Sequence, residues 1–252
     1  MEIAPGMQLA AARSFPPLAV RLQDLAELGY AKVEPYDALL RDPAGLMALV
    51  RAANLIMPSI QAGLPRLRSD LQRVIGMADT LHAGLVIIPD LGQGDYPADT
   101  PGWMRLGAEL AGHAIKLKTA GKRLAWHNRE QEFMRLPDGS RPIEHLFEAS
   151  PDIFWEIDVA WAVRAGEDPV EWIDRYPRRI VAAHLKDIGE SPASGELVWT
   201  DLGQGMLDWG LIVPALRRSA CQHWYAGHGA CLDFERFARR AIQTMRDWSR
   251  PG

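Results

Sequence analysis

The 252-residue sequence has very little cysteine, with only Cys221 and Cys231. Two thiols are too few for a disulfide framework and lack the spacing of a zinc site, so we predict free thiols and a reducing, cytoplasmic location. No segment reaches the roughly 20 consecutive apolar residues that a membrane span needs. The first 15 residues have neither a basic start nor a long apolar stretch, which predicts no secretory signal.

The sequence also lacks any run of basic residues, and its net charge is −4 with a pI near 6.0. It therefore shows no electrostatic footprint of a nucleic-acid partner or of an anionic membrane, and a small molecule is the expected ligand. No linker or low-complexity stretch divides the chain. Apolar residues make up 48% of it and charged residues 24%, which is ordinary for a chain that buries a large core. We predict a single domain over residues 1–252.

Four short apolar runs each end in a polar residue that can do chemistry. The runs are AKVEPY, KRLAWHN, FWEIDVAW and RIVAAHLKD, and the residues are Glu34, His127, Asp158 and His184. In a parallel barrel the carboxyl ends of all strands meet at one mouth, so residues far apart in sequence converge there. The four endings predict the rim of an active site.

Helix boundary signals alternate with these runs. Proline follows a cap residue at Asp42-Pro43, Thr100-Pro101 and Asp168-Pro169, and Gly29 and Gly121 follow helical patterns as left-handed caps. Further strands are expected near residues 8, 58, 87 and 225, with helices near 17–28, 43–53, 67–81, 100–120, 141–149, 169–175, 209–219 and 233–248. The alternation predicts the α/β class and a single (β/α)8 TIM barrel.

Alternate residues of a strand share a face, so Glu156 accompanies Asp158 and Lys186 accompanies His184. We expect Glu156 to pair with Lys186 below the rim; alternatively, Lys186 polarises a carbonyl or acts as an acid. Glu34 has two interpretations as well. It is a general base if burial raises its pKa, or a rim carboxylate that binds sugar hydroxyls.

Other side chains near the rim suit a polar ligand. Arg129 lies two residues after His127 and is expected to point to the same side of the strand. Its planar guanidinium fits a carboxylate or phosphate of the ligand; a surface ion pair is the alternative. Trp161 could stack on the apolar side of a sugar or simply pack. The irregular segment 189–208 follows the seventh strand and is expected to be a functional loop. Within it, Gly203 and Gly205 either shape a turn or let the backbone approach a phosphate.

Six motifs in order give the chain a family resemblance: GYAKVEPY, LAWHN with EF downstream, WEIDVAW, HLKD, DLGQGMLDW and DFERFARRAI. From about Gln8 to the last helix, the chain resembles the xylose isomerase-like sugar phosphate isomerase/epimerase family. The resemblance implies a divalent metal held by Glu, Asp, His and Glu from strands five to eight. Asp158 and His184 match the middle two. In the branch that includes inosose dehydratases, strand five often carries His-Asn-His; His127 and Asn128 match its start, and Arg129 replaces its second His.

Strand eight departs from the family pattern, because Gly227-His228-Gly229 stands where the resemblance implies Glu-His-Asp. The remaining ligands His127, Asp158 and His184 carry one carboxylate, which shifts preference from Mg²⁺ or Mn²⁺ toward Zn²⁺, Co²⁺ or Fe²⁺, or leaves the chain without a metal. His228 reaches the metal only with a small register shift. Both glutamates of the family's two-base epimerisation are missing, so that mechanism does not transfer unchanged.

We therefore expect an isomerase or epimerase that moves a proton next to the carbonyl of a sugar or cyclitol, with a metal (Mn, Zn, Co or Mg) polarising that carbonyl. The alternatives are a dehydratase of a keto-sugar or inosose and a non-catalytic sugar-binding barrel. A homo-oligomer is compatible with the sequence. The residues expected to act are Glu34, His127 and Lys186 in catalysis, Asn128, Arg129, Trp161 and His228 on the substrate, and His127, Asp158 and His184 on the metal.

Overall fold

The computed structural model describes residues 4–92 and 94–249. Within these ranges, parallel strands form an eight-stranded sheet in the order β2-β1-β10-β7-β6-β5-β4-β3. Its members are β1 (Pro5–Gln8), β2 (Lys32–Glu34), β3 (Ser59–Gln61), β4 (Leu85–Ile88), β5 (Arg123–His127), β6 (Ile153–Asp158), β7 (Ile180–Leu185) and β10 (His223–Ala226).

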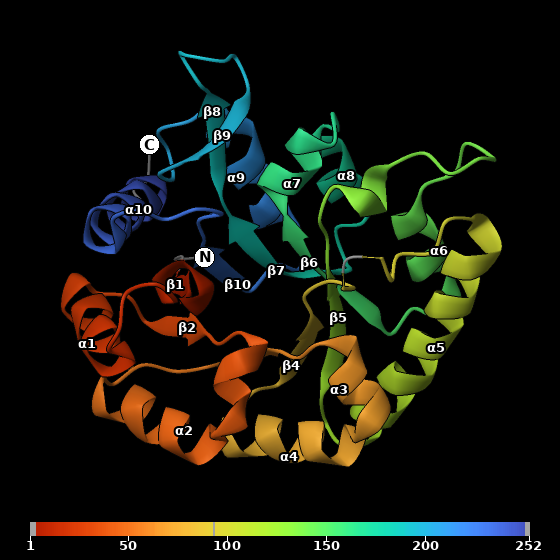
Figure 1. The fold of residues 1–252 in the computed structure, drawn as a ribbon, viewed down its shortest axis with the longest axis horizontal. Coiled ribbons are helices and arrows are strands. Elements are labelled where there is room, and N and C mark those ends of the chain that lie inside the picture. The colour runs from red at the N-terminus through yellow and green to blue at the C-terminus, as the bar shows by residue number, and fades with distance from the viewer. Residues whose placement is uncertain (1–3, 93, 250–252) are drawn as a thin grey trace.

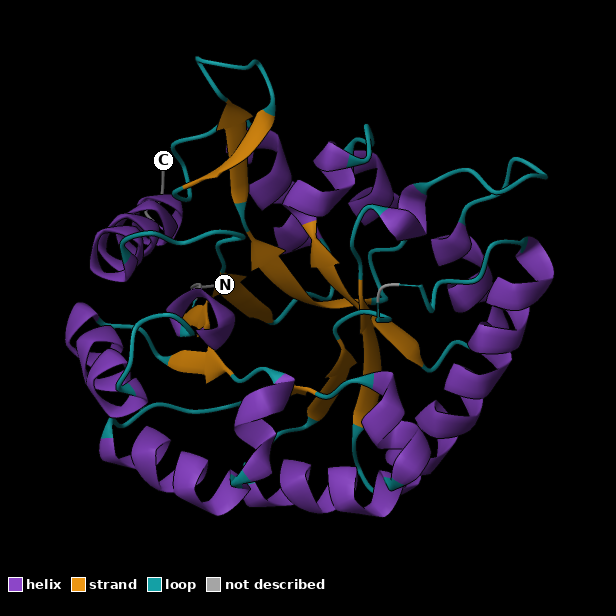
Figure 2. Ribbon diagram, viewed as in Figure 1, coloured by secondary structure: helices purple, strands orange, loops and turns teal. Residues whose placement is uncertain are grey.

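The two outer strands of that order, β2 and β3, meet through a few backbone hydrogen bonds. The Val33 amide donates to the Ile56 carbonyl at 2.9 Å, and the Gln61 amide donates to the Pro35 carbonyl at 3.0 Å. The sheet therefore curls into a nearly closed barrel, with helices outside and strands inside (Figures 1 and 2). The predicted TIM barrel is confirmed.

The helices begin and end close to the predicted positions. They are α1 (Leu18–Leu28), α2 (Pro43–Ala52), α3 (Leu64–Ser69), α4 (Leu71–Thr80), α5 (Thr100–Thr119), α6 (Pro142–Ala149), α7 (Val159–Arg164), α8 (Pro169–Arg175), α9 (Trp209–Arg218) and α10 (Phe234–Ser249). Asp42 and Asp168 cap α2 and α8 as expected, whereas Asp99, not Thr100, caps α5. Among the described residues, no helix combines the length and the apolar character that crossing a bilayer requires.

Two segments differ from the prediction. The expected helix at 67–81 is split, because Asp70 leaves the helical conformation and accepts a hydrogen bond from the Arg73 amide at 2.9 Å, which starts α4. The segment 189–208, expected to be irregular, overlaps an antiparallel hairpin of β8 (Asp187–Glu190) and β9 (Leu197–Thr200). Figure 1 shows this hairpin standing away from the barrel strands.

Strand alternation separates two apolar layers. Side chains such as Val86, Ile88 and Trp155 point outward and belong to the large core between strands and helices. Leu85, Ile87, Ala125, Ala182 and Tyr225 have the opposite strand parity and belong to a small separate cluster that fills the barrel interior. Polar residues of that same inward parity follow toward the carboxyl ends of the strands. The interior thus changes from apolar to polar along the barrel axis, and the polar end holds the candidate site.

Candidate metal centre

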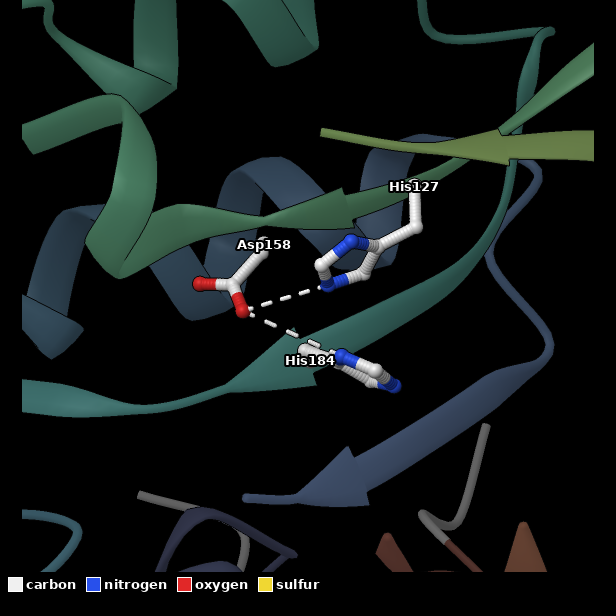
Figure 3. Close-up of side chains that lie close together, drawn as sticks. All are labelled: His127, Asp158 and His184. Carbon is white, nitrogen blue, oxygen red and sulfur yellow. Dashed lines mark ion pairs between the residues drawn. The ribbon is translucent and has the colours of Figure 1, made fainter. Parts of the chain in front are cut away.

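Asp158 joins two imidazoles at the polar end of the barrel. Its Oδ2 lies 3.4 Å from His127 Nε2 and 3.8 Å from His184 Nδ1, and both dashed lines in Figure 3 meet at this oxygen. The β6–β7 register places Asp158 directly beside His184, and β5 brings His127 alongside β6. Asp158 and His184 have no exposed surface, and His127 is also buried. The structure thus brings the three predicted metal ligands together.

The hydrogen bonds of the two rings determine which nitrogen of each faces Asp158. His127 Nδ1 is 2.9 Å from the Pro89 carbonyl, which can only accept, so Nδ1 carries the hydrogen. Burial lowers the pKa of His127 to about 4, so the ring is neutral at pH 7 and its lone pair is on Nε2. His184 Nε2 donates to Glu34 Oε1 at 2.7 Å, and Nδ1 faces Asp158. Burial works to lower the pKa of His184, but the carboxyl groups of Glu156 and Glu34 raise it overall to about 10, so without a metal Nδ1 also carries a hydrogen.

These donor atoms fit a divalent metal. His127 Nε2 and His184 Nδ1 are buried and have no hydrogen-bond partner among the described residues, which is unusual for buried polar atoms. Asp158 Oδ2 is also buried, and its close polar neighbour is the Lys186 ammonium. His127 Nε2 and Asp158 Oδ2 present lone pairs to a cation, and His184 Nδ1 would do so once metal binding displaces its hydrogen. Metal bonds of about 2.0–2.1 Å in a tetrahedron put neighbouring donors about 3.3 Å apart, close to the spacing found. Two imidazoles and one carboxylate suit Zn²⁺ or Co²⁺ better than Mg²⁺.

Lys186 supplies a positive charge to the same carboxylate. Its Nζ lies 2.7 Å from Asp158 Oδ2 as an ion pair. Burial works to raise the pKa of Asp158, but the Lys186 ammonium and the imidazoles of His127 and His184 together outweigh it, so this pKa falls below its ordinary value. Asp158 is therefore a carboxylate at neutral pH.

The predicted pair of Glu156 with Lys186 is wrong. Lys186 lies one residue beyond the end of β7 and turns to Asp158, whereas Glu156 lies 3.3 Å from His184 Nε2 and accepts from Gln61 Nε2 at 3.2 Å. Glu156 lies two residues before Asp158 on β6, on the same inward face but deeper in the barrel. It therefore reaches the imidazole of His184 and not the ammonium of Lys186. The shared parity was correct, but the partner differs.

Glu34 is fully buried beside His184 and does not lie on an exposed rim. Its Oε2 accepts from the Ser59 hydroxyl at 2.6 Å, and that hydroxyl lies 2.8 Å from the Tyr225 hydroxyl. Burial works to raise the pKa of Glu34, but His184 lowers it overall, whereas burial and the charge of Glu34 raise the pKa of Glu156. The ionised Glu34 therefore orients His184, and Glu156 holds a proton.

Asn128 anchors the end of β6. Its Oδ1 accepts from the Asp158 amide and from Trp155 Nε1, each at 2.9 Å, and its Nδ2 donates to the Asp158 carbonyl at 3.1 Å. The side chain is fully buried. Its polar atoms therefore serve the backbone that carries Asp158, and the structure gives Asn128 a positioning contact rather than an open face for substrate.

The other predicted substrate residues are not members of the three-ligand group, although the Trp161 amide donates to Asp158 Oδ1 at 3.2 Å. Arg129 is half exposed and pairs with Asp90, which matches the surface ion pair given as its alternative. Trp161 packs edge-on against Trp199 of β9, with ring centroids 4.9 Å apart. His228 is turned toward Asp201, with 3.7 Å between Nε2 and the carboxylate, and it is absent from the ligand groups found among the described residues.

Asp187 and Trp199 are features of the site region that the sequence analysis missed. Asp187 is buried after Lys186 and accepts from the Gly203 and Gly205 amides at 3.0 and 3.2 Å and from Trp209 Nε1 at 2.8 Å. The two glycine amides are thus used within the loop, which confirms that these glycines shape a turn. The ring of Trp199 lies 5.8 Å from Lys186 Nζ. The motif HLKD, which ends in Asp187, was the signal in the sequence that could have revealed the role of Asp187.

Solved structures of proteins described as isomerases, dehydratases and xylose isomerase-like barrels share this fold. A sugar phosphate isomerase/epimerase from Parabacteroides distasonis superposes with a TM-score of 0.81 at 18% identity, over 96% of this chain and 93% of that chain. A probable 3-DHS dehydratase, AsbF from Bacillus anthracis, gives 0.75 at 10% identity over 98% and 99%. A xylose isomerase-like TIM barrel protein from Mycobacterium smegmatis, in complex with magnesium, gives 0.72 at 17% identity over 98% and 96%.

At these identities the superpositions establish the fold alone, and no protein of curated function matches the sequence. The family assignment comes from the sequence itself, since residues 22–248 match the description of one family. That match covers most of the chain, including all the strands that carry the candidate site. The chain belongs to the xylose isomerase-like TIM barrel family.

Proposed function

We propose that this chain is a metal-assisted enzyme that moves a proton next to the carbonyl of a sugar or cyclitol, giving isomerisation or epimerisation. The observation that carries the proposal is the buried group of His127, Asp158 and His184. The two imidazole nitrogens that face Asp158 lack hydrogen-bond partners, and the Lys186 ammonium lies 2.7 Å from the carboxylate. The isomerase/epimerase class of a superposed structure supports the reaction, and the magnesium of another supports a metal at this mouth.

His127, Asp158 and His184 would hold the metal, which supplies Lewis-acid polarisation of a substrate oxygen when bound. Glu34 fixes the orientation of His184 through its 2.7 Å hydrogen bond, and Asn128 fixes the backbone of Asp158. Lys186 is the group in this cluster that carries a proton and retains some exposure, at 7%. We assign it the proton transfer to or from the substrate.

A dehydratase is the second candidate, favoured by a specific feature of this chain. His127 and Gly227 stand where the resemblance implies two glutamates, so the pair of opposed bases for epimerisation is missing. Removal of water needs one base for the proton and one acid for the leaving hydroxide, and a single lysine can serve both steps in turn. The superposition on a probable dehydratase is consistent with this alternative.

The test is incubation of the protein, loaded with Zn²⁺ or Co²⁺, with a panel of ketoses, aldoses and inososes in D₂O, followed by NMR. An isomerase or epimerase exchanges the hydrogen next to the carbonyl for deuterium and yields an isomer, whereas a dehydratase yields an unsaturated product. Ligand binding with neither exchange nor product across the panel would contradict catalysis and favour a sugar-binding barrel.

Two aspartate variants make the test specific to the site. Asp158→Asn removes the only carboxylate of the three ligands and should lower turnover by at least about a hundredfold, the range seen when support of a metal site is lost. Asp152→Asn changes a surface aspartate that pairs with Lys118, and its turnover should match the unchanged protein. Equal turnover of the two variants would place the reaction elsewhere.

A further inference from the structure

Gly227 leaves a space that Lys186 fills. A Cβ built at residue 227 would lie 2.9 Å from Lys186 Cε and 3.2 Å from Lys186 Cγ, with Gln8 Oε1 at 3.0 Å, closer than side chains normally pack. Gly227 does not have a positive φ, so glycine is required here for space rather than for backbone conformation. The stem of Lys186 thus runs through the volume that a side chain at position 227 would occupy.

The same lysine ends at the proposed metal centre. Its Nζ lies 2.7 Å from Asp158 Oδ2, and Oδ2 is the oxygen that faces His127 and His184. A divalent ion held by this oxygen would bring two positive charges beside the ammonium in a buried site, where like charges repel strongly. Lys186 therefore has to leave Oδ2 when the ion binds. Its flexible four-carbon stem permits that movement.

We propose that Lys186 is a built-in competitor of the divalent metal for Asp158, and that glycine at position 227 allows it. This inference deepens the proposed function and rests on the metal site described there. Binding of metal and release of Lys186 from Asp158 are then one linked equilibrium. The released ammonium is the group to which proton transfer is assigned, so metal binding would also free it for the substrate.

The primary test measures Zn²⁺ affinity by competition with a chromophoric chelator. Lys186→Met keeps most of the stem but removes the charge, and it should bind Zn²⁺ at least about tenfold more tightly than the unchanged protein. Lys32→Met is the matched control. Lys32 is also a buried lysine, but its Nζ donates to the Gln222 carbonyl at 3.1 Å, away from Asp158. The Zn²⁺ affinity of Lys32→Met should stay within about twofold of that of the unchanged protein, well below the tenfold gain expected for Lys186→Met.

A second variant tests the role of the space without removing any charge. Gly227→Ala puts a Cβ against the Lys186 stem and should push the stem aside. Zn²⁺ affinity should therefore rise by at least about threefold, less than the gain expected for Lys186→Met. Gly112→Ala is its control, because a Cβ there meets nothing within 4 Å. If Lys186→Met does not fold, as judged by circular dichroism, Gly227→Ala decides the question.

The outcomes separate this inference from the proposed function. Tighter Zn²⁺ binding in Lys186→Met and Gly227→Ala, with unchanged controls, supports competition. Binding to the unchanged protein with no gain in either variant overturns the competition but leaves the metal site standing. Absence of Zn²⁺ binding in all the proteins overturns both.

Discussion

Glu132 shows how a single buried carboxyl supports the loop that follows His127. It lies in η3 (Gln131–Phe133) with no exposed surface, accepting from the Arg129 amide at 2.7 Å and from Trp126 Nε1 at 3.2 Å. Burial raises its pKa from an ordinary 4.5 to about 7, because these hydrogen bonds do not replace the hydration of the charged form.

The shift predicts a pH dependence of stability. The folded state holds the Glu132 proton more tightly than the unfolded state, so its contribution is complete below about pH 4.5 and is lost as pH rises through about 7. The free energy of unfolding should fall by about 3 kcal/mol across that window through this group. Urea denaturation at several pH values should show that Glu132→Gln removes this slope, while Glu130→Gln retains it. Identical slopes for all three proteins would mean that Glu132 does not titrate there.

Gly6 of β1 lies where the barrel has no room for a side chain. A Cβ at residue 6 would lie 2.5 Å from the Tyr225 ring and 2.8 Å from the Trp224 carbonyl oxygen, and the backbone cannot move aside cheaply. Gly6→Ala should lower the free energy of unfolding by about 1–3 kcal/mol. Gly84→Ala, where a Cβ meets nothing within 4 Å, should differ little from the unchanged protein. A loss below about 0.5 kcal/mol in Gly6→Ala would show that the strand relaxes.

Residue parity was predictable from the sequence, but residue partners were not. Alternation correctly placed Asp158 and His184 on inward faces, because strand geometry depends only on neighbouring residues. The partner of Lys186 depends on the space beside Gly227, which follows β10 much later in the chain, and no local pattern reports that space. The depth of Glu34 within the barrel was likewise invisible to the sequence.

At the scale of elements, Asp187 organises the hairpin and the loop before α9. Its carboxylate accepts from the Gly203 and Gly205 amides and from Trp209 Nε1, and so ties the end of β7 to the start of the next helix. The hairpin itself escaped prediction because its residues are mostly half-buried or exposed and lack a clear apolar alternation.

Loss of this carboxylate should be costly. Asp187→Ala leaves several buried N–H groups without an acceptor, so the free energy of unfolding should fall by about 3 kcal/mol or more. Asp208→Ala removes the cap of α9, one hydrogen bond from the Leu211 amide, and should cost about 1 kcal/mol. Urea denaturation of both variants measures the difference. Equal losses would show that the loop does not depend on Asp187.

At the scale of the whole molecule, most helix boundaries and the alternation of strands and helices followed from local signals, since a proline, a glycine or a capping aspartate marks the start or end of several helices. The eightfold repeat then limited the topology to a barrel. What local signals could not supply was the division of helix 67–81 at Asp70, because a single capping side chain competes with an otherwise continuous helical pattern.

Metal binding should stabilise the whole barrel, because its ligands come from β5, β6 and β7. At Zn²⁺ concentrations about a hundred times the dissociation constant, the free energy of unfolding should rise by about 2.7 kcal/mol, and EDTA should reverse this. His127→Ala should lose the effect. His113→Ala, which changes a histidine on α5 near Glu109, should keep it. Thermal unfolding with and without Zn²⁺ provides the measurement, and equal responses of the two variants would move the site away from β5.

The short contact between β2 and β3 is the part of the barrel wall with few backbone hydrogen bonds between neighbouring strands. Each of these strands has three residues, whereas β6 and β7 have six each and pair along most of their length. Local opening of the native state should therefore start at this seam, with a free energy below that of global unfolding. Backbone amides such as those of Val33 and Gln61 would lose protection first, while the strands that carry Asp158 and His184 stay closed. Because Glu34 ends β2 and forms a hydrogen bond with His184, opening at this seam would also free that ring from its orienting partner.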